Sequence, residues 1–157
     1  MTPTPTPEPE EEQPIVDAIN RVEGTEGNDN PLLGTVGNDE IIGKDGDDVL
    51  IGGQGDDILT GGNGGDTFIF EPANGYDIIT DFAGAMDAIA VTADLGFISS
   101  EQLFEAISPG DFLPGEPQFS VLHLSPDNQV KIFHNDPLTA ANFSVMPPPV
   151  VLEEAVF

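Results

Sequence analysis

Apolar and polar positions alternate along residues 24–70 with a period of nine. In each unit an apolar residue follows an aspartate by two positions, or by three in the first unit, which carries one extra residue. These apolar positions are Leu32, Ile41, Leu50, Leu59 and Phe68. Such short apolar stretches cannot stand alone as strands, but stacked copies can pair as a parallel sheet. The pattern predicts a coil of short parallel strands with a ladder of inward apolar side chains.

The polar half of each unit has the form Gly-x-x-Gly-x-Asp. Its aspartates are Asp29, Asp39, Asp48, Asp57 and Asp66. Glycine allows positive φ and tight turns, so the carbonyl oxygens of this segment can curl toward one point. If two units make one coil, the aspartates of units n and n+2 face each other at about one strand spacing, roughly 4.8 Å. Carboxylates that close repel unless a cation lies between them, and oxygen ligands of this kind suit calcium.

Two of the units, GGQGDDILT and GGNGGDTFI, fit the nonapeptide G-G-x-G-x-D-x-U-x, in which U is apolar. The units GTVGNDEII and GKDGDDVLI lack the second glycine, and the first unit also contains Pro31. On these motifs the chain resembles the hemolysin-type (RTX) calcium-binding repeat proteins. The resemblance implies an all-β fold, a right-handed parallel β-roll, with Ca²⁺ bound between its turns.

The expected side-chain ligands are pairs of aspartates two units apart. These pairs are Asp29 with Asp48, Asp39 with Asp57, and Asp48 with Asp66. Residues 75–79 repeat half of the motif, so Asp77 could close a site with Asp57, whereas Asp81 and Asp87 could be polar strand residues only. Backbone carbonyls of the turn glycines and their neighbours complete each ligand set. The glycines concerned are Gly37, Gly46, Gly53, Gly55, Gly62 and Gly64.

A flexible linker rich in glycine and aspartate is the alternative interpretation of residues 24–70. A linker has no reason to keep a nine-residue register with an apolar residue at a fixed offset, so we favour the roll. Without calcium the same segment is expected to be disordered, because its carboxylates repel and its apolar ladder is thin. Metal binding and folding would then be one event.

The charge balance limits the classes of partner. The chain has 29 acidic residues against three basic ones, which gives a formal net charge of −26. Such a surface repels phosphate backbones and anionic lipid, so neither nucleic acid nor a membrane surface is an expected partner. No stretch reaches the ~18 apolar residues of a membrane span, so membrane insertion is not expected. The absence of cysteine agrees with an extracellular protein that is stabilised by metal instead of disulfides.

Outside the repeats the composition predicts two flanking regions. Residues 1–14 alternate proline with threonine or glutamate and are expected to form a disordered spacer. Residues 15–92 would be the roll, with residues 15–22 as a cap over its first coil. Residues 93–157 would be a C-terminal capping region. In that region we expect a helix at 100–107, a loop at 108–117, a hairpin of 118–124 with 129–134, a helical turn at 139–142 and a strand at 143–146.

The N-terminus lacks the features of a cleaved secretory signal, so export would need another route. The chain ends in Val150-Val151-Leu152-Glu153-Glu154-Ala155-Val156-Phe157. An acidic residue followed by apolar ones at the C-terminus is similar to the ending of many type I secretion substrates, which often carry RTX repeats. We therefore expect a secreted protein that uses the type I secretion machinery.

No catalytic motif is present. The sequence contains neither His-Glu-x-x-His nor Gly-x-Ser-x-Gly, and His123 and His134 are its only histidines. The expected function is that of a secreted, non-enzymatic calcium-binding repeat protein. Two alternatives stay open, namely a cell-surface adhesion or polysaccharide-binding module and a detached secretion and folding tail of a larger extracellular enzyme.

Overall fold

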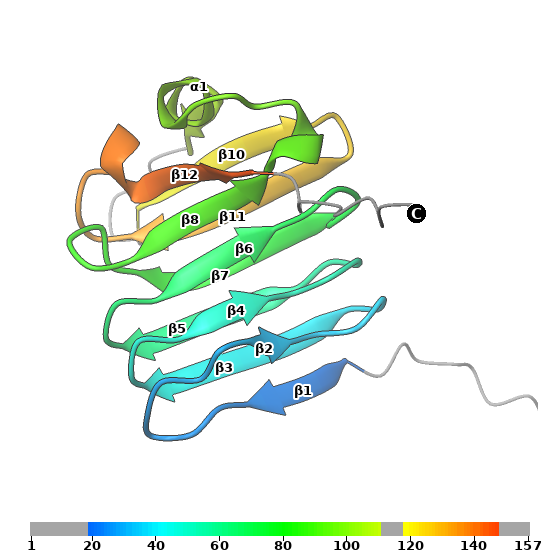
Figure 1. The fold of residues 1–157 in the computed structure, drawn as a ribbon, viewed down its shortest axis with the longest axis vertical. Helices are drawn as coiled ribbons and strands as arrows, with labels where there is room; N and C mark the ends of the chain where they lie inside the picture. The colour runs from blue at the N-terminus through cyan, green and yellow to red at the C-terminus, as the bar shows by residue number, and fades with distance from the viewer. Residues whose placement is uncertain (1–18, 111–117, 148–157) are drawn as a thin grey trace, which may run out of the picture.

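The chain folds into two facing sheets that are wound together as a coil (Figure 1). The structure is a computed structural model and describes residues 19–110 and 118–147. One sheet has seven strands in the order β1-β3-β5-β7-β11-β10-β9, and the other has five in the order β12-β8-β6-β4-β2. The predicted spacer (1–14) and the proposed secretion ending (150–157) lie outside the described residues.

Successive strands of the coil alternate between the two sheets. The first sheet receives β1 (Asn20–Glu23), β3 (Asp39–Asp45), β5 (Ile58–Asn63) and β7 (Tyr76–Phe82). The second receives β2 (Leu32–Leu33), β4 (Val49–Ile51), β6 (Thr67–Phe70) and β8 (Ala88–Thr92). All neighbouring pairs within these two sets are parallel. The predicted all-β parallel roll is therefore confirmed.

The inward ladder lies where the period of nine places it. Ile41, Leu50, Leu59 and Phe68 are all 0% exposed. Ile41 lies opposite Leu59 in one sheet, and Leu50 lies opposite Phe68 in the other. In the stretched first unit, Leu32 still pairs with Leu50 but is only partly buried. The core thus grows by one apolar side chain for each turn of the chain.

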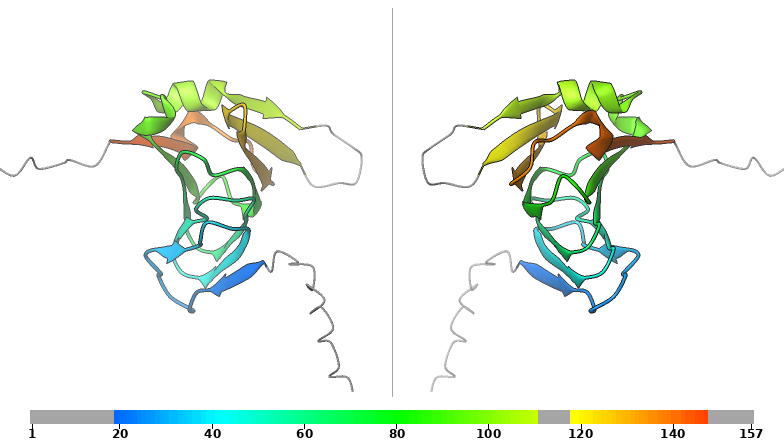
Figure 2. Two further views of the ribbon diagram at one scale, coloured as in Figure 1. Left: turned by 90° about the vertical axis from the view of Figure 1, so that its right-hand side faces the viewer. Right: turned by 90° about the vertical axis from the view of Figure 1, so that its left-hand side faces the viewer.

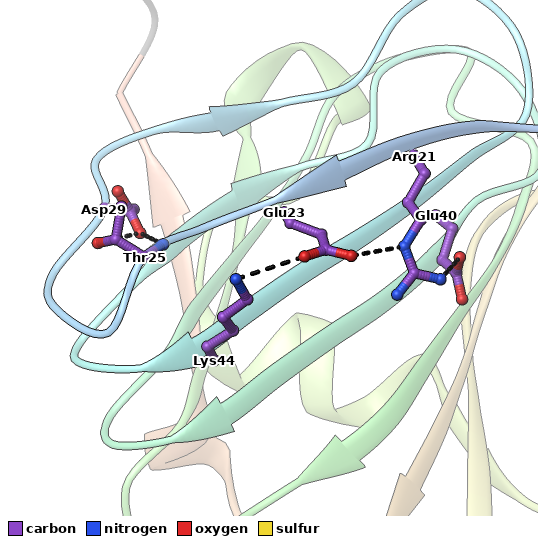
Figure 3. Close-up of polar contacts among 6 residues, drawn as sticks. All are labelled: Arg21, Glu23, Thr25, Asp29, Glu40 and Lys44. Carbon is purple, nitrogen blue, oxygen red and sulfur yellow. Dashed lines mark hydrogen bonds and ion pairs between the residues drawn. The ribbon is translucent and has the colours of Figure 1, made fainter.

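Part of the segment expected to cap the first coil adds a strand to it instead. Of residues 15–22, the structure describes 19–22, and residues 20–22 belong to β1. This strand pairs in parallel with β3 and sets Val22 opposite Ile41. The Arg21 side chain donates to Glu23 and Glu40, and Lys44 lies 3.4 Å from Glu23 (Figure 3). These ion pairs are exposed, so each contributes little, but together they fix the position of β1 on β3.

The C-terminal region continues both sheets of the roll. Its elements are η1 (Ala93–Leu95), α1 (Ser100–Glu105), β9 (Ile107–Pro109), β10 (Phe119–Ser125), β11 (Asn128–His134), η2 (Ala140–Asn142) and β12 (Phe143–Met146). β11 pairs in parallel with β7, and β12 pairs in parallel with β8. Figure 2 shows α1 across the end of the molecule that is opposite β1.

Two local predictions for this region need correction. The helix begins at the expected cap, where the Ser99 hydroxyl accepts from the amide of Gln102, but it ends at Glu105 and not at 107. Ile107 instead starts β9, so the first residues of the expected loop 108–117 form a strand against β10. The predicted hairpin, helical turn and final strand are present.

Truncation of the ladder should destabilise the roll strongly. Leu59→Ala removes a fully buried side chain between two neighbours, and we expect it to lower the free energy of unfolding by about 2–5 kcal/mol. Val36→Ala is the matched control, because Val36 is 79% exposed in a turn, and it should change stability by less than about 0.5 kcal/mol. Chemical denaturation in saturating calcium measures both, and equal losses would contradict the inward ladder.

Candidate metal centre

The Gly-x-x-Gly-x-Asp segments form the turns between the two sheets and stack along two edges of the roll. We number them turn 1 (24–29), turn 2 (34–39), turn 3 (43–48), turn 4 (52–57) and turn 5 (61–66). Two later segments, turn 6 (72–77) and turn 7 (82–87), continue the series without the full motif. Odd-numbered turns stack on one edge and even-numbered turns on the other. The space between two stacked turns is called a shelf and is named by them, as in shelf 3/5.

A continuous ladder of hydrogen bonds joins the aspartates along each edge. The backbone amide of each aspartate donates to Oδ1 of the aspartate two turns later, over 2.7–3.0 Å. The joined pairs are Asp29 with Asp48, Asp39 with Asp57, Asp48 with Asp66, Asp57 with Asp77, and Asp66 with Asp87. The structure therefore brings together every pair expected from the sequence and adds one that ends on Asp87.

The second carboxylate oxygen of three of these aspartates has no partner. Oδ2 of Asp48, of Asp57 and of Asp66 is buried and accepts no hydrogen bond. All three residues are only 1% exposed. An unpaired buried carboxylate oxygen is costly, because the water it gave up is not replaced by another polar partner. Such an atom points to an ion that would satisfy it.

Carbonyl oxygens face the same spaces as these orphaned atoms. A Cβ on Gly43 would lie 2.4 Å from Asp48 Oδ2 and 2.4 Å from the carbonyl oxygen of Gly61 in the turn above. A Cβ on Gly64 would lie 2.0 Å from the carbonyl oxygen of Gly46 below. A side chain on either glycine would fill the space beside these oxygens. Carboxylate and carbonyl oxygens in a small hollow are the ligands that Ca²⁺ prefers, so the residues present fit the ion.

The six glycines predicted as carbonyl ligands fall into two groups. The carbonyl oxygens of Gly37, Gly46 and Gly55 face the fourth-position glycine of the turn above, and so lie along the shelves. The other three, Gly53, Gly62 and Gly64, have φ values of 104°, 105° and 132° and abut the backbone of the turn below. A Cβ on Gly62 would come within 1.9 Å of a carbonyl oxygen there, so the close stacking of turns requires glycine.

Sequence reasoning missed the first-position carbonyls and one carboxylate. The carbonyls of Gly52 and Gly61 point back into the shelf below them. Asp81, at the end of β7, accepts from the amides of Gly61 and Gly62 at 3.0 and 2.9 Å. The repeated first-position glycine was a signal for the carbonyls. No repeat marked Asp81, which the sequence left as a polar strand residue.

The remaining aspartates of the series have hydrogen-bonded Oδ2 atoms. Asp29 Oδ2 accepts from the amide and hydroxyl of Thr25 at 2.6 and 3.1 Å (Figure 3). Asp39 Oδ2 accepts in the same way from Thr35, at 2.6 and 3.0 Å. In turn 7, Asp87 Oδ2 accepts from the amide of Ala83.

Turn 6 contains both a hydrogen-bonded carboxylate oxygen and a buried oxygen without a partner. Asp77 Oδ2 accepts from the side-chain amide of Asn74. Oδ1 of Asn74 is itself buried and has no partner. In turn 6, therefore, the buried oxygen without a partner belongs to the side-chain amide of Asn74 and not to the carboxylate of Asp77.

Burial raises the pKa of the shelf carboxyls. It raises the pKa of Asp57 and Asp66 to about 6 and that of Asp77 to about 7, and nearby aspartates add to the shift through repulsion. Burial also raises the pKa of Asp87. In the metal-free fold, each of these groups therefore holds a proton more readily than an exposed aspartate does.

Each of the two histidines lies beside a serine hydroxyl. His123 Nε2 lies 2.8 Å from the Ser108 hydroxyl, and His134 Nε2 lies 2.9 Å from the Ser120 hydroxyl. Within residues 19–110 and 118–147, no three His, Cys, Asp or Glu side chains converge on one point. Carbonyl oxygens must therefore supply part of any ligand set on the shelves.

Comparisons with known proteins agree with this arrangement. The family model of the RTX calcium-binding nonapeptide repeat matches residues 33–68, in four copies. No curated protein matches the chain. The chain thus carries calcium-binding RTX repeats, and the resemblance and the identity of the ion, Ca²⁺, are confirmed. The matching family is not a catalytic one.

The solved structures that are similar to the chain include two solution structures of subunits of a mannuronan C5-epimerase from Azotobacter vinelandii. The AlgE6R2 subunit is 26% identical, with 79% of this chain and 91% of that chain covered and a TM-score of 0.50. The AlgE6R3 subunit is 23% identical, with 76% and 79% covered and a TM-score of 0.42. The first of these supports the roll architecture. Among the described residues, no helix is long and apolar enough to cross a membrane.

Acid should partly replace calcium as the factor that orders the roll. The pKa values of Asp57, Asp66 and Asp77 are raised in the fold above the ordinary 3.8, so the folded state binds protons more tightly than the unfolded chain. The stability linked to these protons is fully present below about pH 4 and is lost as the pH rises through about 6 to 7. In chelator, circular dichroism should therefore show more β-structure at about pH 5 than at about pH 8.

A substitution separates this effect from the general reduction in charge. Asp57→Asn removes one shelf carboxyl that must be neutralised, so its metal-free form should lose less β-structure between acid and alkaline pH. Asp56→Asn removes the neighbouring exposed charge, whose repulsion is a smaller cause of the raised pKa values of Asp57 and Asp77 than burial is, so it should change the profile less than Asp57→Asn does. If all three chains titrate identically in chelator, the buried carboxyls do not control the transition.

Proposed function

We propose that this chain is a secreted, non-enzymatic calcium-binding protein whose roll folds when ions bind on its shelves. The observation that supports this most directly is the orphaned Oδ2 atom on each of Asp48, Asp57 and Asp66. A bound cation would offset the cost of burying these negatively charged oxygens. The matching repeat family is calcium-binding, which points to Ca²⁺ as that cation. One bound ion brings two positive charges to carboxylates that otherwise oppose folding.

Charge couples the binding of calcium to folding. At a formal net charge of −26, the unfolded chain is expanded by repulsion. Stacking the turns brings their carboxylates to about one strand spacing, which raises that repulsion until ions bind. Free calcium outside cells matches the roughly 10⁻⁴–10⁻³ M affinities of extracellular calcium modules, so the roll would fold after export.

The proposed ligand sets combine one or more aspartates with backbone carbonyls. In shelf 3/5 these are the carboxylate of Asp48 and the carbonyl of Gly61, whose oxygens both lie beside Gly43, together with the carbonyl of Gly46, which faces Gly64 of the turn above. In shelf 4/6 they are Asp57 and the carbonyl of Gly55. In shelf 5/7 the free carboxylate oxygen is that of Asp66. When bound, the ion acts as a cross-link between turns and takes part in no reaction.

Export through the type I secretion machinery is part of the proposal. Its support is the acidic and apolar C-terminal ending, the absence of cysteine and the link between RTX repeats and extracellular proteins. A chain that stays unfolded at low calcium would suit passage through a narrow export channel. Detection of the chain in the medium, and its loss after deletion of residues 150–157, would test this part.

One observation favours a second candidate function. The similar AlgE6R2 structure is that of a subunit of a mannuronan C5-epimerase, so a module of this fold can be part of an enzyme. By analogy, this chain would act as a secretion and folding tail, or as an adhesion module that binds polysaccharide at the cell surface. Calcium-dependent retention of the chain on a polysaccharide column would favour this candidate over a free secreted product.

Calcium, and not magnesium, should order the chain. Isothermal titration calorimetry at neutral pH should show binding of several Ca²⁺ ions, together with a gain of β-structure by circular dichroism. Magnesium at the same concentration should produce neither, because it needs near-ideal octahedral geometry at about 2.0–2.1 Å and dehydrates reluctantly. A chain that is equally ordered in chelator and in millimolar calcium would contradict the proposed function.

The register of the aspartates gives a second test. Asp57→Ala removes a buried shelf carboxylate and should shift the midpoint of calcium-induced folding to at least about tenfold higher calcium, since one ion is lost. Asp56→Ala changes the adjacent exposed residue, whose Oδ1 atom already accepts from the amide of Tyr76, and should shift it far less. Equal shifts in a calcium titration followed by circular dichroism would remove the register from the proposal.

A further inference from the structure

The five Gly-x-x-Gly-x-Asp turns differ, among other positions, at their second residue. In turns 1 and 2 the second residue is threonine, and its backbone amide donates to the Oδ2 atom of the aspartate that ends the turn. We call these turns closed. In turns 3, 4 and 5 the second residue has a left-handed backbone, and the Oδ2 atom of the aspartate has no partner. We call these turns open, and their second residues are Lys44, Gly53 and Gly62, with φ values of 93°, 104° and 105°.

Backbone conformation explains the difference. A β-branched residue strongly disfavours positive φ, so Thr25 and Thr35 keep ordinary φ values and their amides face the aspartate. Glycine adopts positive φ freely, and with that backbone the amide no longer reaches the carboxylate. Lys44 adopts the same conformation although it carries a Cβ, and its turn is open. The state of a turn therefore follows its second residue in all five repeats.

In a closed turn the Oδ2 atom of the aspartate is already hydrogen-bonded within the protein. Asp39 shows this most completely, because its Oδ1 accepts from the side chain of Asn20 at 2.6 Å and its Oδ2 accepts from Thr35. An ion on shelf 2/4 would have to displace these donors, so the net gain from binding would be small. In an open turn the same atom is buried without any partner, and the ion satisfies it at no such cost.

We infer that the second residue of each turn decides whether the shelf above it binds calcium, and that only shelves 3/5, 4/6 and 5/7 do so. This inference rests on the proposed function and goes further, because the repeat motif by itself treats all of the aspartates alike. It gives three ions in a chain whose aspartate ladder has five shelves. Turns 1 and 2 then form a calcium-independent start of the roll.

The contacts of the first strand agree with such a start. β1 is fixed on β3 by the ion pairs of Arg21 with Glu23 and Glu40 (Figure 3). Two of the three basic residues of the chain, Arg21 and Lys44, lie at this end of the roll. At this end of the roll Thr25 and Thr35 satisfy the Oδ2 atoms of Asp29 and Asp39, as calcium would satisfy those of the open turns.

Position 44 allows a matched test of the inference. Lys44→Thr converts turn 3 to the Gly-Thr-x-Gly-x-Asp sequence of turns 1 and 2, and we expect it to close the turn. Calorimetry of the full chain with CaCl₂ should then give two ions in place of three. Lys44→Gly loses the same contact with Glu23 but keeps the left-handed backbone, so it should still bind three. Equal stoichiometry of the two variants would overturn the inference.

The aspartates of turns 2 and 4 give an independent comparison on the other edge. Asp39→Asn should leave the number of bound ions at three, whereas Asp57→Asn should lower it to two. Both residues are 1% exposed, so burial alone does not separate them. If Lys44→Thr or Asp57→Asn fails to fold in saturating calcium, the numbers of ions bound by the parent chain and by Asp39→Asn still test the inference. Three ions in each support the inference, and five in the parent or a loss in Asp39→Asn overturns it.

The outcomes also separate this inference from the proposed function. If Asp39→Asn and Asp57→Asn each lose one ion, calcium binds the closed shelf 2/4 as well as the open shelf 4/6, and only the distinction between open and closed turns is wrong. If the parent chain binds no calcium by calorimetry, the proposed function is wrong and the inference falls with it.

Discussion

The repulsion between stacked carboxylates is the constraint on which the rest of this structure depends. Parallel strands must lie about 4.8 Å apart, and the turn that joins them ends each time in an aspartate. The fold reduces this repulsion at both oxygens of each carboxylate. One carboxylate oxygen of each upper aspartate accepts the amide of the aspartate below it, while the second oxygen needs a donor or a cation. The apolar ladder and the sheet hydrogen bonds form against this repulsion, and neutralisation of the carboxylates lowers its cost.

Glycine has two separate duties in these turns. At the second and fourth positions its left-handed backbone and missing Cβ allow one turn to lie directly on the next, as Gly62 and Gly64 show. At the first position, as in Gly43, it leaves open the hollow between a carboxylate and a carbonyl oxygen. The first duty is structural in any stacked roll, and the second concerns the ion. A substitution at either position would therefore act through a different physical cause.

Much of the architecture could be predicted from the sequence because one period governs it. The offset between aspartate and apolar residue fixed the inward positions of Ile41 and Leu59, and the same period identified the aspartate pairs. The difference between Asp39 and Asp57 could not be predicted, since both occupy the same column and only the backbone of the second turn residue separates them. Asp81 and β9 were also missed, because non-repeating residues place them through contacts distant in sequence.

The parallel pairing of β11 with β7 and of β12 with β8 has a consequence for the free protein. The last coil of any such roll presents two strands whose unpaired amides and carbonyls could bind another chain. Here residues 128–146 fill both positions, and the hairpin then turns antiparallel and ends at the three-residue β9. The C-terminal strands thus cover the edges of the last coil, so that these edges cannot serve as a template for fibrous growth at that end.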